Sequence, residues 1–199
     1  GFPKLLNKDK ILEVVKERLQ ERFKSLDSVI LFGSRNPETD LDLCVILQDN
    51  SNIDEYFHSN IVDMPQYNKS DFLNRVRLFD IVVTQPIMTG DLIFGDEKEF
   101  LSLRQYLMEN KPNQEVIKYL EQRTNECYSY ASHLLRNNWG KDSIINGLLA
   151  LTYALSYNEC LTRYKNGNKI TLFSEINNSK IREIRDEIKI LENLIFFIN

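Results

Sequence analysis

The sequence contains few of the residues that build disulfide scaffolds and zinc sites. Among its 199 residues are three cysteines, no Cys-x-x-Cys pair and two histidines, His58 and His133. These counts argue against a disulfide-stabilised scaffold and against a His/Cys zinc site. The longest apolar stretch, residues 147–156, is far too short to cross a membrane, and no secretion signal opens the sequence. We therefore expect a reduced, soluble, cytoplasmic protein with no membrane partner.

The sequence also has no excess of basic over acidic residues. The 29 Asp and Glu outnumber the 25 Lys and Arg, so the net charge is −4, and the pI is about 5.4. Residues 1–110 contain 13 Lys and Arg against 19 Asp and Glu, and residues 111–199 contain 12 against 10. Neither part offers a basic track along which a nucleic acid could bind, so a polynucleotide partner is not favoured.

The overall composition is that of an ordinary globular protein, with 42% hydrophobic and 27% charged residues. Its patterning changes at Lys111-Pro112. Up to this point helical periodicity alternates with β-rich runs, whereas no convincing strand follows it. We predict an α+β protein of two domains: a small mixed β-sheet with flanking helices over residues 1–110, and an all-α helical bundle over residues 111–199.

The first domain should open with a helix and contain three strands. Apolar residues at helical spacing predict a helix over residues 6–24. Strands are predicted over residues 28–32, 40–47 and 78–84, and the second should be central because its end is apolar on both faces. The connector at residues 49–76 is polar and poorly patterned, which predicts helix and loop.

The remaining sequence predicts an antiparallel bundle of four or five helices. Tyr128 is among the residues expected in its core. The sequence ends on bulky apolar residues at 191–198, which should pack against something, so we expect either a homodimer contact through the last helix or a chain that has been truncated. The predicted helices cover residues 97–109, 113–137 and 143–164, a short stretch after Thr171, and residues 180–197.

Two acids stand out in the predicted strand at residues 40–47. Asp40 and Asp42 are two positions apart, so their side chains project from one face, about 6–7 Å apart. Carboxylates this close repel each other and invite a divalent cation. Asp80 is a third acid, set in an otherwise apolar predicted strand, and it would join the pair if the two strands are neighbours. Oxygen-only ligation favours Mg²⁺ or Mn²⁺ over zinc.

A tight turn at Gly33-Ser34 follows the first predicted strand. Its backbone N–H groups offer an anion site, and Arg35 adds a cation beside it. An anion site that faces a carboxylate metal site is suited to phosphoryl or nucleotidyl transfer.

Together these residues resemble the nucleotidyltransferase superfamily, which has a DNA polymerase β-like fold, and within it the kanamycin- and streptomycin-type enzymes. In that superfamily Gly-Ser follows the first strand, Asp-x-Asp opens the next, and a later strand supplies a third acid. The resemblance covers about residues 28–84. The matching runs are Phe32-Gly33-Ser34-Arg35, Asp40-Leu41-Asp42-Leu43 and Phe79-Asp80-Ile81.

The resemblance implies a role for each site residue. Gly33 and Ser34 would hold the β- and γ-phosphates of a nucleoside triphosphate (NTP), with ATP as the first candidate. Asp40 and Asp42 would bind two Mg²⁺ or Mn²⁺ ions. Asp80 would complete the metal site and draw the proton from the attacking hydroxyl.

The resemblance thus implies Mg²⁺-dependent transfer of a nucleoside monophosphate from an NTP to a hydroxyl acceptor. The acceptor would be a small molecule, such as an aminoglycoside-like compound, or a protein. One departure supports an alternative, because only residues 35–39 separate Ser34 from Asp40, where the superfamily has a longer connector. The alternative is a non-catalytic module of the same fold that binds nucleotide or serves as the antitoxin-type partner of a toxin.

Overall fold

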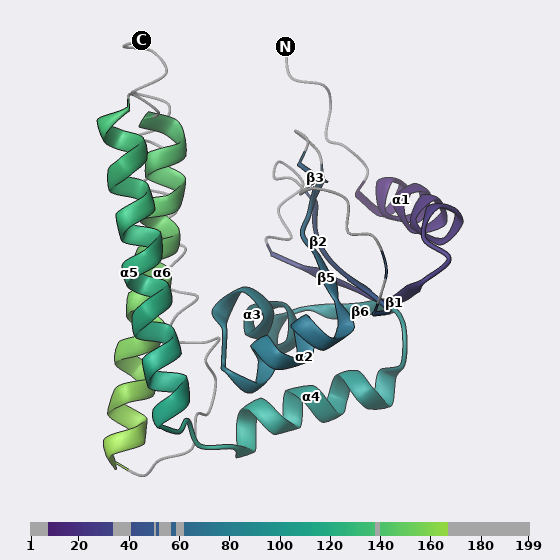
Figure 1. Cartoon of the computed structure of the whole chain (residues 1–199). Helices are drawn as coiled ribbons and strands as arrows, with labels where there is room; N and C mark the ends of the chain where they lie inside the picture. The colour runs from purple at the N-terminus through teal and green to yellow at the C-terminus, as the bar shows by residue number, and fades with distance from the viewer. Residues whose placement is uncertain are drawn as a thin grey trace. The chain divides into compact units, whose positions relative to one another are not determined.

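The computed structural model (Figure 1) describes residues 8–33, 41–49, 51, 57–58, 62–137 and 140–166. The chain folds into two compact units. The first comprises Gly1–Val76 and Val82–Gln105, and the second comprises Arg77–Ile81 and Tyr106–Asn199. The helices predicted beyond residue 166 and the apolar end at 191–198 lie outside the described residues.

The described strands of the first unit form one mixed sheet. They are β1 (Leu26–Phe32), β2 (Leu41–Leu47), β3 (Phe57–His58), β4 (Val62–Met64), β5 (Gln66–Asn68) and β6 (Asp91–Phe94). Their order is β3-β4-β2-β1-β6, with β5 also paired to β2. β2 is parallel to β4 and β5, and the other pairs are antiparallel. β1 and β2 confirm two predicted strands, and β2 is central and almost wholly buried.

The segment at residues 49–76, predicted as helix and loop, contributes three of these strands, so that prediction was wrong in part. β4 pairs with the start of β2 and β5 pairs with its end, and Pro65 separates the two short strands. Proline has no N–H to donate, but its carbonyl accepts a hydrogen bond from the backbone N of Val45 at 2.9 Å. The prediction holds for α2 (Lys69–Arg77), whose first turn is capped by Asp49 through the backbone N of Ser70 at 2.9 Å.

The strand predicted at residues 78–84 was wrong. The run begins as a turn and continues into α3 (Ile81–Thr89). Its β-branched residues are typical of strands. In the structure, however, the buried residues Ile81, Thr84 and Ile87 recur at helical spacing. Tertiary burial therefore outweighs the intrinsic preference of the run.

One face of the sheet packs against α1 (Lys8–Arg22), which confirms the helix predicted over residues 6–24. The other face packs against α2 and α4 (Glu97–Glu109), which confirms the helix predicted there; with the sheet they line a cavity of about 20 Å³. Figure 1 shows α1 and α2 on opposite sides of the strands. The core against α1 comprises Leu19, Val29, Leu41, Leu43, Val45, Leu47, Val62 and Met64.

Most of the described part of the second unit is a helical hairpin. α5 (Gln114–Arg136) and α6 (Gly140–Asn166) confirm two predicted helices and pack side by side in opposite directions (Figure 1). Asn113 caps α5, because its Oδ1 accepts a hydrogen bond from Val116 N at 3.0 Å. Tyr128, expected in the core, is 67% exposed, so that prediction was wrong. No described helix combines the length and the apolarity that crossing a bilayer requires.

Candidate functional site

Two carboxylates occupy matching positions on adjacent strands of the sheet. Asp42 in β2 is in register with Asp63 in β4. Their strand neighbours Leu41, Val62 and Met64 belong to the core that packs against α1, whereas the two acids are half-buried. Successive residues of a strand alternate between its two faces. Both acids therefore project from the face opposite α1, on strands about 5 Å apart.

Gly33 forms a turn at the end of β1, next to this pair. Its φ is +81°, in the left-handed region that glycine adopts at little cost. A Cβ at this position would run into the carboxylate of Asp42, so the backbone of the turn lies directly against that carboxylate. The preceding residue, Phe32, is in register with Asp42 across the β1–β2 pair. The turn and the acid are thus held together by the sheet itself.

The structure brings together two of the residues predicted for the site, Gly33 and Asp42. Three others, Ser34, Arg35 and Asp40, lie outside the described residues, and their roles stay predictions. The chain ties them to described positions, because Ser34 directly follows Gly33 and Asp40 stands two residues before Asp42.

The sixth predicted residue, Asp80, has a different setting. It belongs to no strand, directly precedes α3 and falls in the second compact unit. Its side chain is completely buried. Oδ1 accepts a hydrogen bond from the hydroxyl of Tyr153 at 2.6 Å, and Oδ2 accepts one from the hydroxyl of Tyr119. The strand predicted to carry Asp80 beside Asp40 and Asp42 is a turn followed by a helix, so that part of the prediction is wrong, and the metal-binding role of Asp80 stays a prediction.

Sequence reasoning missed Asp63, although a signal for it exists. The run Val62-Asp63-Met64 repeats the apolar–acid–apolar alternation of Leu41-Asp42-Leu43. The strand is only three residues long, however, and Pro65 follows it. A pattern this short identifies a strand only once its pairing partner is known.

The donor atoms at this place are carboxylate oxygens, the ligands that Mg²⁺ and Mn²⁺ prefer, and two acids this close favour a cation between them. On the other side of β4 from Asp42, His58 of β3 is in register with Asp63. Cys44 shares a strand face with Asp42, but burial raises the pKa of its thiol far above the usual value, so it stays protonated and is a poor ligand.

Two described carboxylates fit a metal site in part. Among the residues that the structure describes, no group of three or more acids, histidines or cysteines is placed to hold a metal ion. A complete site therefore needs a further ligand from outside that part of the chain, and Asp40 is the residue that the sequence predicts for it.

Comparison with known proteins gives no match to a protein-family model and no similar curated protein. Some solved structures are similar to the chain. One is a nucleotidyltransferase-like protein from Exiguobacterium sibiricum, with 14% identity and a TM-score of 0.45, covering 88% of this chain and 63% of that chain. Another is a mutant of the toxin–antitoxin MntA–HpeT, with 14% identity and a TM-score of 0.31, covering 65% of this chain and 99% of that chain.

The chain spans less than two thirds of the length of the Exiguobacterium protein. At these TM-scores neither likeness carries an argument about activity or partners. The chemistry of the site rests on the chain's own residues, above all Gly33, Asp42 and Asp63.

Proposed function

We propose that the chain is a Mg²⁺-dependent nucleotidyltransferase, which transfers a nucleoside monophosphate from an NTP, with ATP as the first candidate, to a hydroxyl acceptor. The observation that carries the proposal is the register of Asp42 with Asp63 beside the Gly33 turn. An acid pair next to a tight glycine turn combines a cation site with an anion site, and a metal-bound triphosphate requires both.

Asp63 replaces Asp80 as the third acid in this proposal. Asp42, Asp63 and the predicted ligand Asp40 would hold two Mg²⁺ or Mn²⁺ ions. Asp80 is less suited to this role, because both of its carboxylate oxygens already accept hydrogen bonds from tyrosines. Ions bound by these three acids would offset the negative charge that develops as the α-phosphate is attacked and pyrophosphate leaves.

Phosphate binding and proton transfer would be carried out by backbone and side-chain groups of the chain. The backbone N–H groups of Gly33 and Ser34 would hold the β- and γ-phosphates, with Arg35 as a further cation. A carboxylate of the site would accept the proton of the attacking hydroxyl. The hydroxyl oxygen would then bond to the α-phosphorus while the bond from that phosphorus to the pyrophosphate oxygen breaks.

The acceptor in this proposal is a small molecule with a reactive hydroxyl, such as an aminoglycoside-like compound, or a protein hydroxyl. The charge of the chain supports these two classes over a polynucleotide, because residues 1–110 carry six more acidic than basic side chains. A phosphate backbone would be repelled by such a surface.

A second candidate is a non-catalytic module that binds nucleotide or, as an antitoxin-type partner, another protein. One observation favours it: only residues 35–39 connect Ser34 to Asp40, so little chain is available to surround a triphosphate. A screen of acceptors with labelled NTPs separates the two candidates. Transfer of label supports the enzyme, whereas nucleotide binding without any transfer supports the module.

Calorimetry with Mg²⁺ and a non-hydrolysable ATP analogue tests the proposed site. The variants are Asp42→Asn, Asp63→Asn and Asp80→Asn, with Asp9→Asn as a matched control, because Asp9 is an exposed acid on α1. We expect the first two to lose affinity by at least about tenfold, since even outer partners of a metal site are worth that much. The other two should bind like the wild type, and circular dichroism verifies that each variant is folded.

Two results would contradict the proposal. Loss of binding in a folded Asp80→Asn variant, with normal binding in Asp63→Asn, would return the metal-site role to Asp80. Absence of Mg²⁺-dependent nucleotide binding in the folded wild type would remove the metal–triphosphate site itself.

A further inference from the structure

The five residues Arg77–Ile81 connect α2 to α3, two helices of the first unit, yet they fold with the second unit. The four residues that follow Arg77 are all buried, with exposed fractions of 7% or less. Connections between helices normally run over the surface, because their backbone polar groups need water. The 77–81 segment is therefore held in place by specific contacts.

Asp80 makes the central contact. Tyr153 of α6, itself fully buried, donates its hydroxyl to Oδ1 at 2.6 Å, and Tyr119 of α5 donates to Oδ2. Burial, and after it the Asp80 carboxylate, raises the pKa of Tyr153 far above its usual value, so the hydroxyl keeps the proton that it donates. The Arg123 guanidinium lies 5.1 Å from the centre of the Tyr153 ring. One carboxylate thus joins the 77–81 segment to both helices of the hairpin.

Two further contacts hold the segment on either side of Leu78. Arg77 forms a bidentate pair with Glu115 of α5, with Nη1 2.7 Å from Oε2 and Nη2 3.2 Å from Oε1. Phe79 stacks on Tyr106, with ring centroids 6.1 Å apart. Phe79 has a φ of +54°, a conformation that bulky residues adopt only where the surrounding structure enforces it.

We propose that the 77–81 segment is a conformational latch, closed only while the α5–α6 hairpin holds Asp80 between Tyr119 and Tyr153. A buried carboxylate that loses a hydroxyl donor is left uncompensated and is driven toward water. The strained backbone at Phe79 then loses the contacts that enforce it. A condition or partner that shifts α6 against α5 would therefore open the connection between α2 and α3. The latch does not depend on the nucleotide chemistry proposed above.

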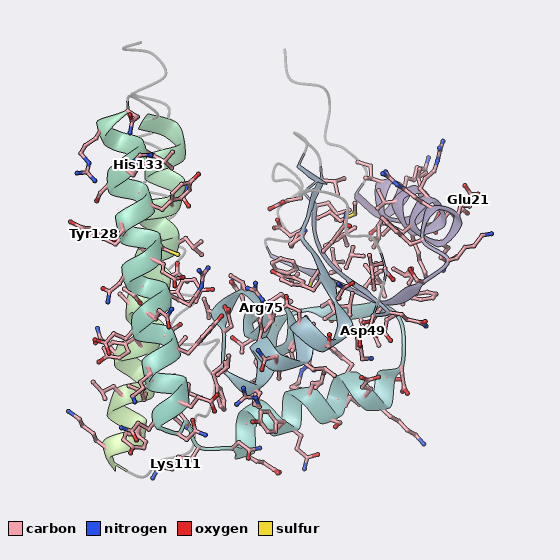
Figure 2. All side chains as sticks on the ribbon, in the orientation of Figure 1. Glu21, Asp49, Arg75, Lys111, Tyr128 and His133 are labelled. Atoms are coloured by element: carbon pink, nitrogen blue, oxygen red, sulfur yellow. The ribbon has the colours of Figure 1, made fainter. Side chains whose placement is uncertain are left out.

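Amide hydrogen exchange on the full chain tests the latch with single hydroxyl deletions. Tyr153→Phe and Tyr119→Phe each remove one donor to Asp80. Tyr128→Phe is the matched control, because Tyr128 projects outward from α5 (Figure 2) and is 67% exposed. In Tyr153→Phe we expect the amides of the 77–81 segment to exchange at least about tenfold faster, by a larger factor than those of α5 and α6, while those of β2 keep their rates. We also expect trypsin to cleave after Arg77 faster in this variant than in the wild type.

The control must match the wild type in both assays. Unchanged protection of the 77–81 segment in both Tyr153→Phe and Tyr119→Phe would overturn the latch. An equal rise in exchange across the segment, α5 and α6 would overturn it too, because the hydroxyls would then stabilise the second unit as a whole. If Tyr153→Phe does not fold, the same comparison is made with Tyr119→Phe. This variant keeps the hydrogen bond from the fully buried Tyr153 hydroxyl to Asp80.

Discussion

The hydroxyl of Tyr153 lies 2.6 Å from Oδ1 of Asp80, and neither residue has any exposed surface. An acid whose sequence context resembles that of a catalytic residue is thus one half of a buried polar pair. Burying a carboxylate is costly unless hydrogen bonds replace the lost water. The stability of the second unit should therefore be sensitive to the loss of either partner.

Removing the hydroxyl in Tyr153→Phe should lower the free energy of unfolding by about 1–3 kcal/mol, the cost of a buried acceptor that loses its donor. Tyr128→Phe deletes the same atom from an exposed ring and should change the free energy of unfolding by less than about 0.5 kcal/mol. Urea denaturation of both variants measures the difference. Equal losses would mean that the hydrogen bond to Asp80 contributes nothing of its own.

The close approach of Gly33 to Asp42 predicts a double effect of Gly33→Ala. The added methyl group meets the carboxylate, and alanine is strained at a φ of +81°. We expect a loss of about 1–3 kcal/mol in unfolding free energy, together with a loss of Mg²⁺-dependent nucleotide binding. Chemical denaturation and calorimetry measure the two effects.

Gly147→Ala is the matched control for this change. A Cβ at Gly147, inside α6, meets nothing within 4 Å. Because alanine is the better helix former, this variant should keep nucleotide binding and gain up to about 1 kcal/mol. A Gly33→Ala protein with wild-type stability and binding would show that the turn does not support the Asp42 carboxylate.

Adding and removing Mg²⁺ should change the stability of the wild type more than that of Asp63→Asn. A ligand that binds only the folded state stabilises it by about 2.7 kcal/mol at a concentration one hundred times its Kd. We therefore expect Mg²⁺ with the ATP analogue to raise the melting temperature of the wild type, and chelation to reverse the rise. The same rise in Asp63→Asn would remove Asp63 from the proposed site.

The pair of Arg77 with Glu115 predicts a pH-dependent contribution to stability. The hydrogen bond from Arg77, and then its charge, lower the pKa of Glu115 below its ordinary value of 4.5. A group with a lowered folded-state pKa stabilises the fold above its unfolded pKa, and this contribution is lost as the pH falls through the folded value. Glu115→Gln should therefore be less stable than the wild type near neutral pH.

As the pH falls from 4.5 through the lowered folded-state pKa of Glu115, the same difference should disappear, because Glu115 becomes protonated in the wild type as well. Urea denaturation at low ionic strength over this range gives the comparison, since salt weakens exposed ion pairs. A destabilisation that is the same at acidic and neutral pH would mean that Glu115 acts through packing and not through its charge.

The elements that could be predicted from the sequence are those with a repeating pattern of their own. α1, α4, α5 and α6 show helical periodicity, and β1 and β2 show apolar runs of strand length, so local burial preferences identify them. Part of the candidate site follows from the same patterns. Gly33 and Asp42 come from the end of one predicted strand and the start of the next, so they lie close together once these two strands pair.

The tertiary structure decided which acid lies beside Asp42. Asp63 reaches that position through a three-residue strand, which forms only because β2 offers it a partner in register. Asp80 is drawn elsewhere by Tyr119 and Tyr153, which lie 39 and 73 residues further along the chain. The sequence of residues 78–84 is typical of a strand. These residues form a turn and the start of a helix, because partners distant in the sequence bury them. Pairing and burial free energies depend on groups that only folding brings together, so no local pattern encodes them.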